Sequence, residues 1–165
     1  MSITPDTIKE QQRVYAIAYA IAERAHAGQF RHLPDARPYF EHVKDVAALM
    51  PTWELKTVAI LHDAIEDTTD KPEGIKVTED SLKAAGLPPH IVQGVVAMTK
   101  PKGADYEQYI RDKVKVNALA RAVKLADNYV NLKDRLAALI AGDATAEEKV
   151  HKYGLSLKIL TEPKR

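Results

Sequence analysis

The amino-acid sequence predicts an all-α fold: one domain, residues 1–165, built as a helical bundle of about eight helices. Apolar residues recur three or four positions apart through most of the chain, as on the buried face of a helix. No stretch alternates apolar and polar residues with the period of two that marks a half-buried strand. Prolines, glycines and capping residues separate the periodic stretches, so each helix has a predicted start and end.

Composition narrows the class of protein. A chain of 165 residues, 45% hydrophobic, is long enough to bury the core of one domain. The formal net charge of +1 provides no overall field to attract nucleic acid or an anionic membrane. Cysteine is absent, which excludes disulfides, thiolate zinc sites and thiol nucleophiles. With neither a signal-peptide pattern nor an apolar run of roughly 20 residues, we expect a cytoplasmic protein that does not enter a membrane.

Start and end signals along the chain divide it into helical stretches. They are residues 5–27, 38–50, 52–68, 78–86, 88–98, 106–116, 117–140 and 145–162. Thr52, Thr78 and Asn117 are the expected N-caps of three of these helices. Thr145 and Glu148 have the spacing of a capping box.

Two connecting segments carry positive charge. A loop over residues 29–37 holds Arg31, His32 and Arg37, and its composition alone favours a solvated basic loop. Residues 100–103 form a predicted turn with two lysines.

The densest cluster of reactive side chains is the stretch Leu61-His62-Asp63-Ala64-Ile65-Glu66-Asp67-Thr68. If this stretch is helical, His62, Asp63, Glu66 and Asp67 converge over about one turn. Carboxylates at that spacing repel one another, and a bound cation would remove the repulsion. The preceding apolar run, residues 58–61, places the cluster at the edge of a core. A metal site and a solvated acidic turn remain equally good interpretations of this stretch alone.

Two other predicted helices supply donors of the same kinds. His42 lies on or beside an apolar stripe, where a histidine is more often a core residue than a ligand. Asp127 also falls in an apolar stripe, where a carboxylate is costly unless it is paired or binds a metal. An exposed Lys124–Asp127 pair is the alternative. Imidazole combined with carboxylate suits manganese, iron or zinc better than calcium.

Four stretches together resemble a known family. They are residues 25–31 (AHAGQFR), 38–42 (PYFEH), 61–68 (LHDAIEDT) and 123–127 (VKLAD) with Asn131. In order and spacing they are similar to the HD phosphohydrolase superfamily. Within it, they most resemble the alarmone hydrolase domain of the RelA/SpoT family and its free-standing relatives, the small alarmone hydrolases. The resemblance extends over about residues 10–160.

The resemblance implies a role for each matching residue. His42, His62, Asp63 and Asp127 would bind one divalent metal, usually Mn²⁺, and Glu66 and Asp67 would act on the nucleophilic water. The substrate-binding positions would be Arg31, His32, Lys124 and Asn131. The implied reaction removes the 3′-pyrophosphate of ppGpp or pppGpp, giving GDP or GTP and pyrophosphate. The expected partner is thus a small nucleotide.

The sequence departs from the family pattern at several positions. Val43 replaces a proline, and His32 replaces a lysine, which would make phosphate binding sensitive to pH. Residues 128–130 (NYV) also differ, at positions expected to border the base or ribose. The alternatives are therefore hydrolysis of (p)ppApp or NADPH, and a non-catalytic nucleotide-binding sensor. A nucleic-acid-binding module is disfavoured by the balanced charge and by only 6% aromatic residues.

Overall fold

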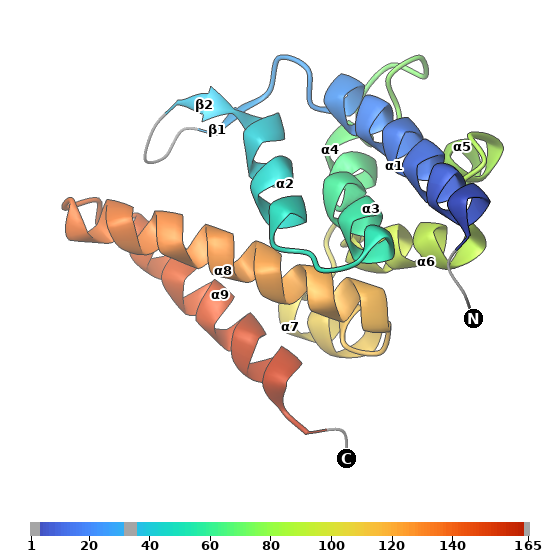
Figure 1. Ribbon diagram of the computed structural model, residues 1–165. Helices are drawn as coiled ribbons and strands as arrows, with labels where there is room; N and C mark the ends of the chain where they lie inside the picture. The colour runs from blue at the N-terminus through green and yellow to red at the C-terminus, as the bar shows by residue number, and fades with distance from the viewer. Residues whose placement is uncertain (1–3, 32–35, 164–165) are drawn as a thin grey trace.

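The computed structural model describes residues 4–31 and 36–163, and the predicted all-α bundle is confirmed (Figure 1). In chain order the elements are α1 (Pro5–Ala25), β1 (Phe30–Arg31), β2 (Arg37–Pro38), α2 (Tyr39–Ala48), α3 (Trp53–Leu61), α4 (Ala64–Thr68), α5 (Glu79–Ala84), α6 (Pro89–Met98), α7 (Tyr106–Tyr109), the π-helix η1 (Ile110–Val114), α8 (Ala118–Ile140) and α9 (Ala146–Thr161). No helix in the described ranges is both long and apolar enough to cross a membrane.

The bundle is built around α3. Val58, Ala59, Ile60 and Leu61 are all fully buried, so the C-terminal half of this helix is apolar on every side, as a central helix requires. Helices α1, α2, α6 and α8 pack around it. The long helices α8 and α9 lie side by side along one edge of the molecule (Figure 1). The C-terminal end of α3 therefore lies in the interior.

Three of the predicted helix starts are confirmed by their hydrogen bonds. The side chains of Thr52, Thr78 and Asn117 accept from backbone N–H groups three residues further on. The capping box predicted at Thr145 is wrong. Thr145 has helical backbone angles and makes no capping bond. Its hydroxyl and backbone N–H instead donate to Asp143, which holds the turn before α9.

The predicted helix over residues 52–68 is interrupted. α3 ends at Leu61 and α4 starts at Ala64, with Asp63 at the N-cap position of α4. His62 and Glu66 consequently do not share the face of one continuous helix. The segment 106–116 is similarly divided into α7 and η1. The loop over residues 29–37 contains a short antiparallel ribbon that pairs Arg31 with Arg37.

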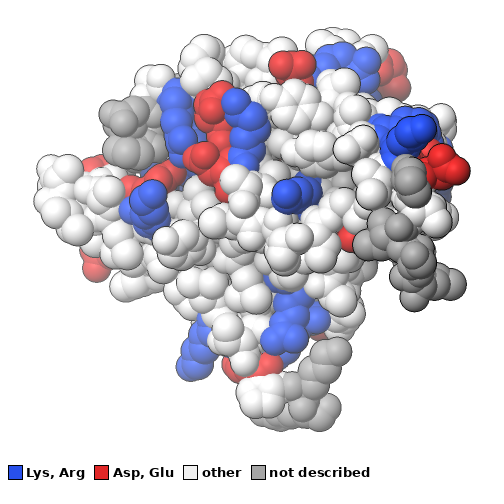
Figure 2. All heavy atoms as spheres, viewed as in Figure 1, with Lys and Arg blue, Asp and Glu red and all other residues white. Residues whose placement is uncertain are grey.

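The space-filling view shows acidic and basic side chains interspersed, with no large patch of one sign among the described residues on that face (Figure 2). This distribution agrees with the net charge of +1. The face shown therefore offers no broad charged surface to a polyanion.

The packing of α6 against α3 leads to a stability prediction. A Cβ at Gly94 would lie 2.9 Å from Cγ2 of Val58 and 3.4 Å from Cβ of Leu119. Gly94→Ala should therefore destabilise the protein by about 1–3 kcal/mol, as overpacking usually does. Gly154→Ala is the matched control, because Gly154 lies in α9 with nothing within 4 Å of the new Cβ. That change should stabilise by about 0.5–1 kcal/mol through helix propensity. Urea unfolding measures the free energy of unfolding of both variants. Equal changes in the two would contradict the close packing of α6 against α3.

Candidate metal centre

Three parts of the fold bring two imidazoles and two carboxylates together. His42 lies on α2, His62 and Asp63 occupy the break between α3 and α4, and Asp127 lies on α8. His42, His62 and Asp127 are at most 3% exposed, so the cluster is inside the protein. The break between α3 and α4 matters here, because it places two consecutive side chains at the end of a buried helix.

The polar atoms of these four residues face a common point. His62 Nε2 lies 2.9 Å from Asp63 Oδ2 and 3.5 Å from Asp127 Oδ1. His42 Nε2 lies 3.1 Å from the same oxygen of Asp127. One ligand atom from each of His42, His62 and Asp63 can be chosen so that all lie within 4.8 Å of one another. These distances would allow a single ion to contact His42, His62 and Asp63, with Asp127 Oδ1 next to both histidines.

The orientation of His62 favours metal binding. Its Nδ1 lies 2.7 Å from the carbonyl oxygen of Ala59, so Nδ1 carries a proton and donates it there. A backbone carbonyl on the far nitrogen is the usual support of a metal-ligating histidine. His62 Nε2 is buried and has no hydrogen-bond partner among the described residues, despite its short distance to Asp63. The Nε2 atom of His62 is therefore a buried nitrogen that lies close to two carboxylates without making a hydrogen bond to either.

The surrounding groups hold the two carboxylates in place. Asp63 accepts from the hydroxyl of Tyr39 at 2.6 Å. Asp127 accepts from Asn131 on Oδ1 at 2.6 Å and pairs with Lys124 on Oδ2 at 2.8 Å. These contacts leave each carboxylate with lone pairs directed toward the histidines.

The electrostatics of the cluster suit a cation. Burial lowers the pKa of His42, so its imidazole is neutral and available as a ligand. Burial by itself raises the pKa of Asp127, but Lys124 and the histidines outweigh it and hold that pKa well below its usual range. Burial likewise opposes charge on His62, yet Asp63 and Asp127 raise its pKa well above the ordinary value. A divalent ion would replace that proton. Nitrogen and carboxylate donors in this combination fit a divalent transition metal.

A cavity of about 130 Å³ adjoins the cluster and contains positive charge and phenol groups. It is lined by Tyr39, Asp63, Glu66, Lys100, Tyr106, Tyr109, Lys124, Asp127, Asn131, Lys152 and Tyr153. Glu66 accepts from the backbone N–H of Lys100 at 2.9 Å, which fixes its carboxylate at the rim. The Nζ atom of Lys152 lies 4.2 Å from the ring centroid of Tyr106. Burial lowers the pKa of Lys152, with Lys149 and Lys124 adding to the effect.

Several of these lining residues were not identified from the sequence. The sequence predicts Lys100 in a turn, within a stretch that weakly supports the family resemblance, and assigns it no role at the site. Lys152 and Tyr153 belong to the last helix, where no local motif marks them. Tyr106 and Tyr109 border the π-helix, a distortion often found at functional sites, but the sequence does not predict it. To identify these residues, one would need to know how η1 and α9 pack against α8.

Two of the expected site residues, Arg31 and Asp67, do not line the described cavity. His32 is outside the described residues. Arg31 does not line the described cavity: its guanidinium lies behind the cluster, against Nδ1 of His42 and 2.9 Å from Oδ1 of Asn131. Asp67 also does not line it, and its Oδ2 lies 3.6 Å from Nδ1 of the buried His26. Burial, followed by the charges of Asp63 and Glu66, raises the pKa of Asp67 to about 7.

The helical bundle, with this His, His-Asp, Asp cluster at its centre, shares its fold with a solved hydrolase structure. In particular, the chain is similar to the solved structure of a metazoan ortholog of SpoT that hydrolyzes ppGpp and plays a role in starvation responses. The TM-score is 0.72 at 18% sequence identity, and the match covers 90% of this chain and 85% of that one. At this identity the likeness establishes the fold. No protein-family model matches the sequence, and neither does any curated protein.

The geometry predicts that a divalent ion stabilises the protein. Manganese at about 100 times its dissociation constant should add about 2.7 kcal/mol, because it binds the folded state alone. For a chain of this length, that corresponds to a rise of about 5–10 °C in the melting temperature of metal-stripped protein. Asp127→Ala should abolish most of the rise. Asp80→Ala, an exposed control on α5, should preserve it. An unchanged melting curve at saturating manganese would argue against the site.

Proposed function

We propose that this protein is a metal-dependent hydrolase that removes the 3′-pyrophosphate of guanosine alarmones, converting ppGpp or pppGpp to GDP or GTP and pyrophosphate. One observation carries the proposal: the cluster of His42, His62, Asp63 and Asp127 opens into a cavity that holds both an acidic side chain and several lysines. Hydrolysis of a pyrophosphate ester needs an activated water molecule, together with nearby positive groups that offset the negative charge of the phosphates. The likeness to a ppGpp hydrolase supports the choice of substrate.

The four clustered side chains would hold the ion, for which manganese is our choice. Two imidazoles and two carboxylates are donors that would suit manganese. When bound there, such an ion would lower the pKa of a water molecule to about 7–9 and so supply a nucleophile near neutral pH.

Glu66 and Asp67 would move protons in this reaction. Glu66 lines the cavity beside Asp63, and the Lys100 backbone N–H orients it toward the space where water and substrate meet. Asp67 lies one position further along α4, and its pKa of about 7 matches the requirement for an acid or base at neutral pH. We therefore assign proton abstraction from water and proton delivery to the leaving group to this pair.

Positive and hydrogen-bonding groups around the cavity would bind the substrate phosphates. Lys124 and Asn131 were expected in this role and line the cavity, and Lys100 and Lys152 join them. At about 130 Å³ the cavity is smaller than the roughly 300–1,000 Å³ of a typical small-molecule site. We infer that it receives one phosphate of the pyrophosphoryl group, that the other phosphate reaches Arg31 beside the cluster, and that the nucleoside extends outward.

The positions expected to border the base give no preference for guanine. Asn128 is fully buried and donates to Ser156 at 2.6 Å, so it joins α8 to α9. Tyr129 and Val130 line a different cavity, between α2 and α8. Hydrolysis of (p)ppApp or NADPH, and binding without hydrolysis, are therefore the outcomes that the first experiment must distinguish.

That experiment incubates manganese-loaded protein with ppGpp, pppGpp, ppApp and NADPH and resolves the products by anion-exchange chromatography. We expect GDP and pyrophosphate from ppGpp, and the corresponding GTP from pppGpp. Turnover of ppApp or NADPH alone would change the substrate assignment. Binding of every nucleotide with no product would identify a sensor and refute the proposed reaction.

The division of roles within the acidic stretch leads to a second prediction. Glu66→Gln and Asp67→Asn should retain manganese but lower the turnover number by roughly 10²-fold or more, as loss of a general acid or base does. Single-turnover kinetics and metal analysis of the same samples test this. Glu73→Gln, on an exposed loop, is the control and should match the parent. Loss of metal from either variant, with retention in His62→Ala, would reverse the assignment of ligands and proton carriers.

A further inference from the structure

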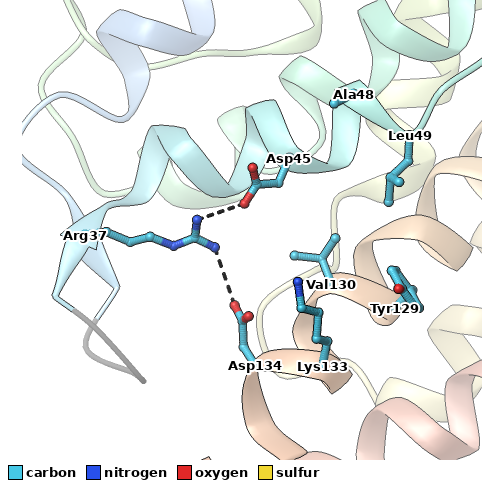
Figure 3. A pocket seen from close by; sticks show the side chains of 8 residues that line it. All are labelled: Arg37, Asp45, Ala48, Leu49, Tyr129, Val130, Lys133 and Asp134. Carbon is cyan, nitrogen blue, oxygen red and sulfur yellow. Dashed lines mark hydrogen bonds and ion pairs between the residues drawn. The ribbon is translucent and has the colours of Figure 1, made fainter. Parts of the chain in front are cut away.

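Two arginines on neighbouring strands share one carboxylate. Arg31 and Arg37 are paired in the β1–β2 ribbon, and both guanidinium groups reach Asp134 on α8. The Nη2 atoms lie 3.3 Å (Arg31) and 3.6 Å (Arg37) from Asp134 Oδ2. Arg37 is also held by Asp45, with Nη1 2.8 Å from Oδ2 (Figure 3). Asp134 is thus the counter-ion of a pair of arginines.

The Arg31–Asp134 contact is buried but incompletely satisfied. The two side chains are 7% and 14% exposed. Asp134 Oδ2 makes no hydrogen bond within the described ranges, so the arginines hold it by charge alone. A buried ion pair without good hydrogen bonds gains little over its desolvation cost. A phosphate that accepts two hydrogen bonds from a guanidinium forms a stronger contact. Arg31 is therefore well suited to exchange the carboxylate of Asp134 for a phosphate group.

Arg31 connects this carboxylate to the metal centre. Its guanidinium contacts His42 and Asn131 on one side and Asp134 on the other. Asn131 in turn bonds Asp127. The Nη1 and Nη2 atoms of Arg31 therefore already have protein partners, and the contact with Asp134, at 3.3 Å, is the longest of the three. A substrate phosphate that binds Nη2 would displace Asp134 most easily.

We propose that Asp134 is a built-in competitor of the substrate: it occupies Arg31 while the site is empty, and a phosphate group of the incoming pyrophosphate takes its place. This inference rests on the proposed function, which makes Arg31 a phosphate-binding residue. Arg37 has a specific part, because it keeps a cation on Asp134 after Arg31 departs. Without Arg37, the exchange would leave the largely buried carboxylate of Asp134 without a positive partner, which is costly in free energy. Asp134 therefore sets the affinity for the phosphates and takes no part in the chemistry.

The test is calorimetric titration of manganese-loaded protein with inorganic pyrophosphate, so that no turnover is needed. Asp134→Asn keeps the shape of the side chain and removes its charge, and it should lower the dissociation constant about tenfold. Asp45→Asn is the matched control: Asp45 holds Arg37 but does not contact Arg31, so binding should stay within about twofold of the parent. Arg37→Gln should act in the opposite direction and weaken binding at least threefold, since Asp134 then has Arg31 as its sole arginine among the described residues.

Unchanged or weaker binding by Asp134→Asn, with a parent-like melting temperature, overturns the inference and makes Asp134 a support of Arg31. If that variant does not fold, the direction of the Arg37→Gln effect decides, and tighter or unchanged binding refutes the proposal. Absence of pyrophosphate binding in the parent and in Asp134→Asn also refutes it. Tighter binding by Asp134→Asn in a protein that hydrolyses no nucleotide would support the exchange and refute the proposed reaction. Hydrolysis of ppGpp together with unaltered pyrophosphate binding by Asp134→Asn would support the proposed reaction and refute the exchange.

Discussion

The interior of this bundle must hold two carboxylates and two imidazoles away from water, and much of the structure compensates for that constraint. Asp127 is 3% exposed, and its charge is met by Lys124, Asn131 and the two histidines. Removing one partner from a buried ion pair typically costs about 3–5 kcal/mol, because the other charge is left without compensation. The cluster therefore requires α2, α3 and α8 to pack in one arrangement, and that arrangement also creates the candidate metal centre.

The end of α3 shows how a local change in the backbone meets this constraint. A helix buried on all sides has nowhere to place charged side chains unless it stops. α3 stops at Leu61, and His62 and Asp63 turn into the centre before α4 begins. The restart separates the side chains of the acidic stretch: Glu66 lines the cavity and Asp67 lies against His26. A continuous helix would have placed all four polar residues along one side.

The arginines of the ribbon extend the same network outward. Arg31 contacts the metal centre and Asp134, and Arg37 and Asp45 complete a set of two positive and two negative groups at the edge of the cavity between α2 and α8. Substrate binding at the proposed site therefore depends on charges that already have partners. Affinity in such a network is decided by which partner offers the better hydrogen bonds, since the Coulomb attraction to a carboxylate and to a phosphate oxygen is similar.

The sequence by itself determined the all-α class, three of the N-caps and the residue types at the centre, because periodicity and capping depend on neighbours three or four positions away. It also singled out His42, His62, Asp63 and Asp127 through their order and spacing. The break at His62, the π-helix and the positions of Lys100 and Lys152 were decided by tertiary packing, as was the capture of Arg31 by Asp134. Arg31 and Asn131 are separated by 100 positions in the chain yet share a hydrogen bond. Contacts of that range arise only when the helices pack, because no local pattern specifies which surfaces will meet.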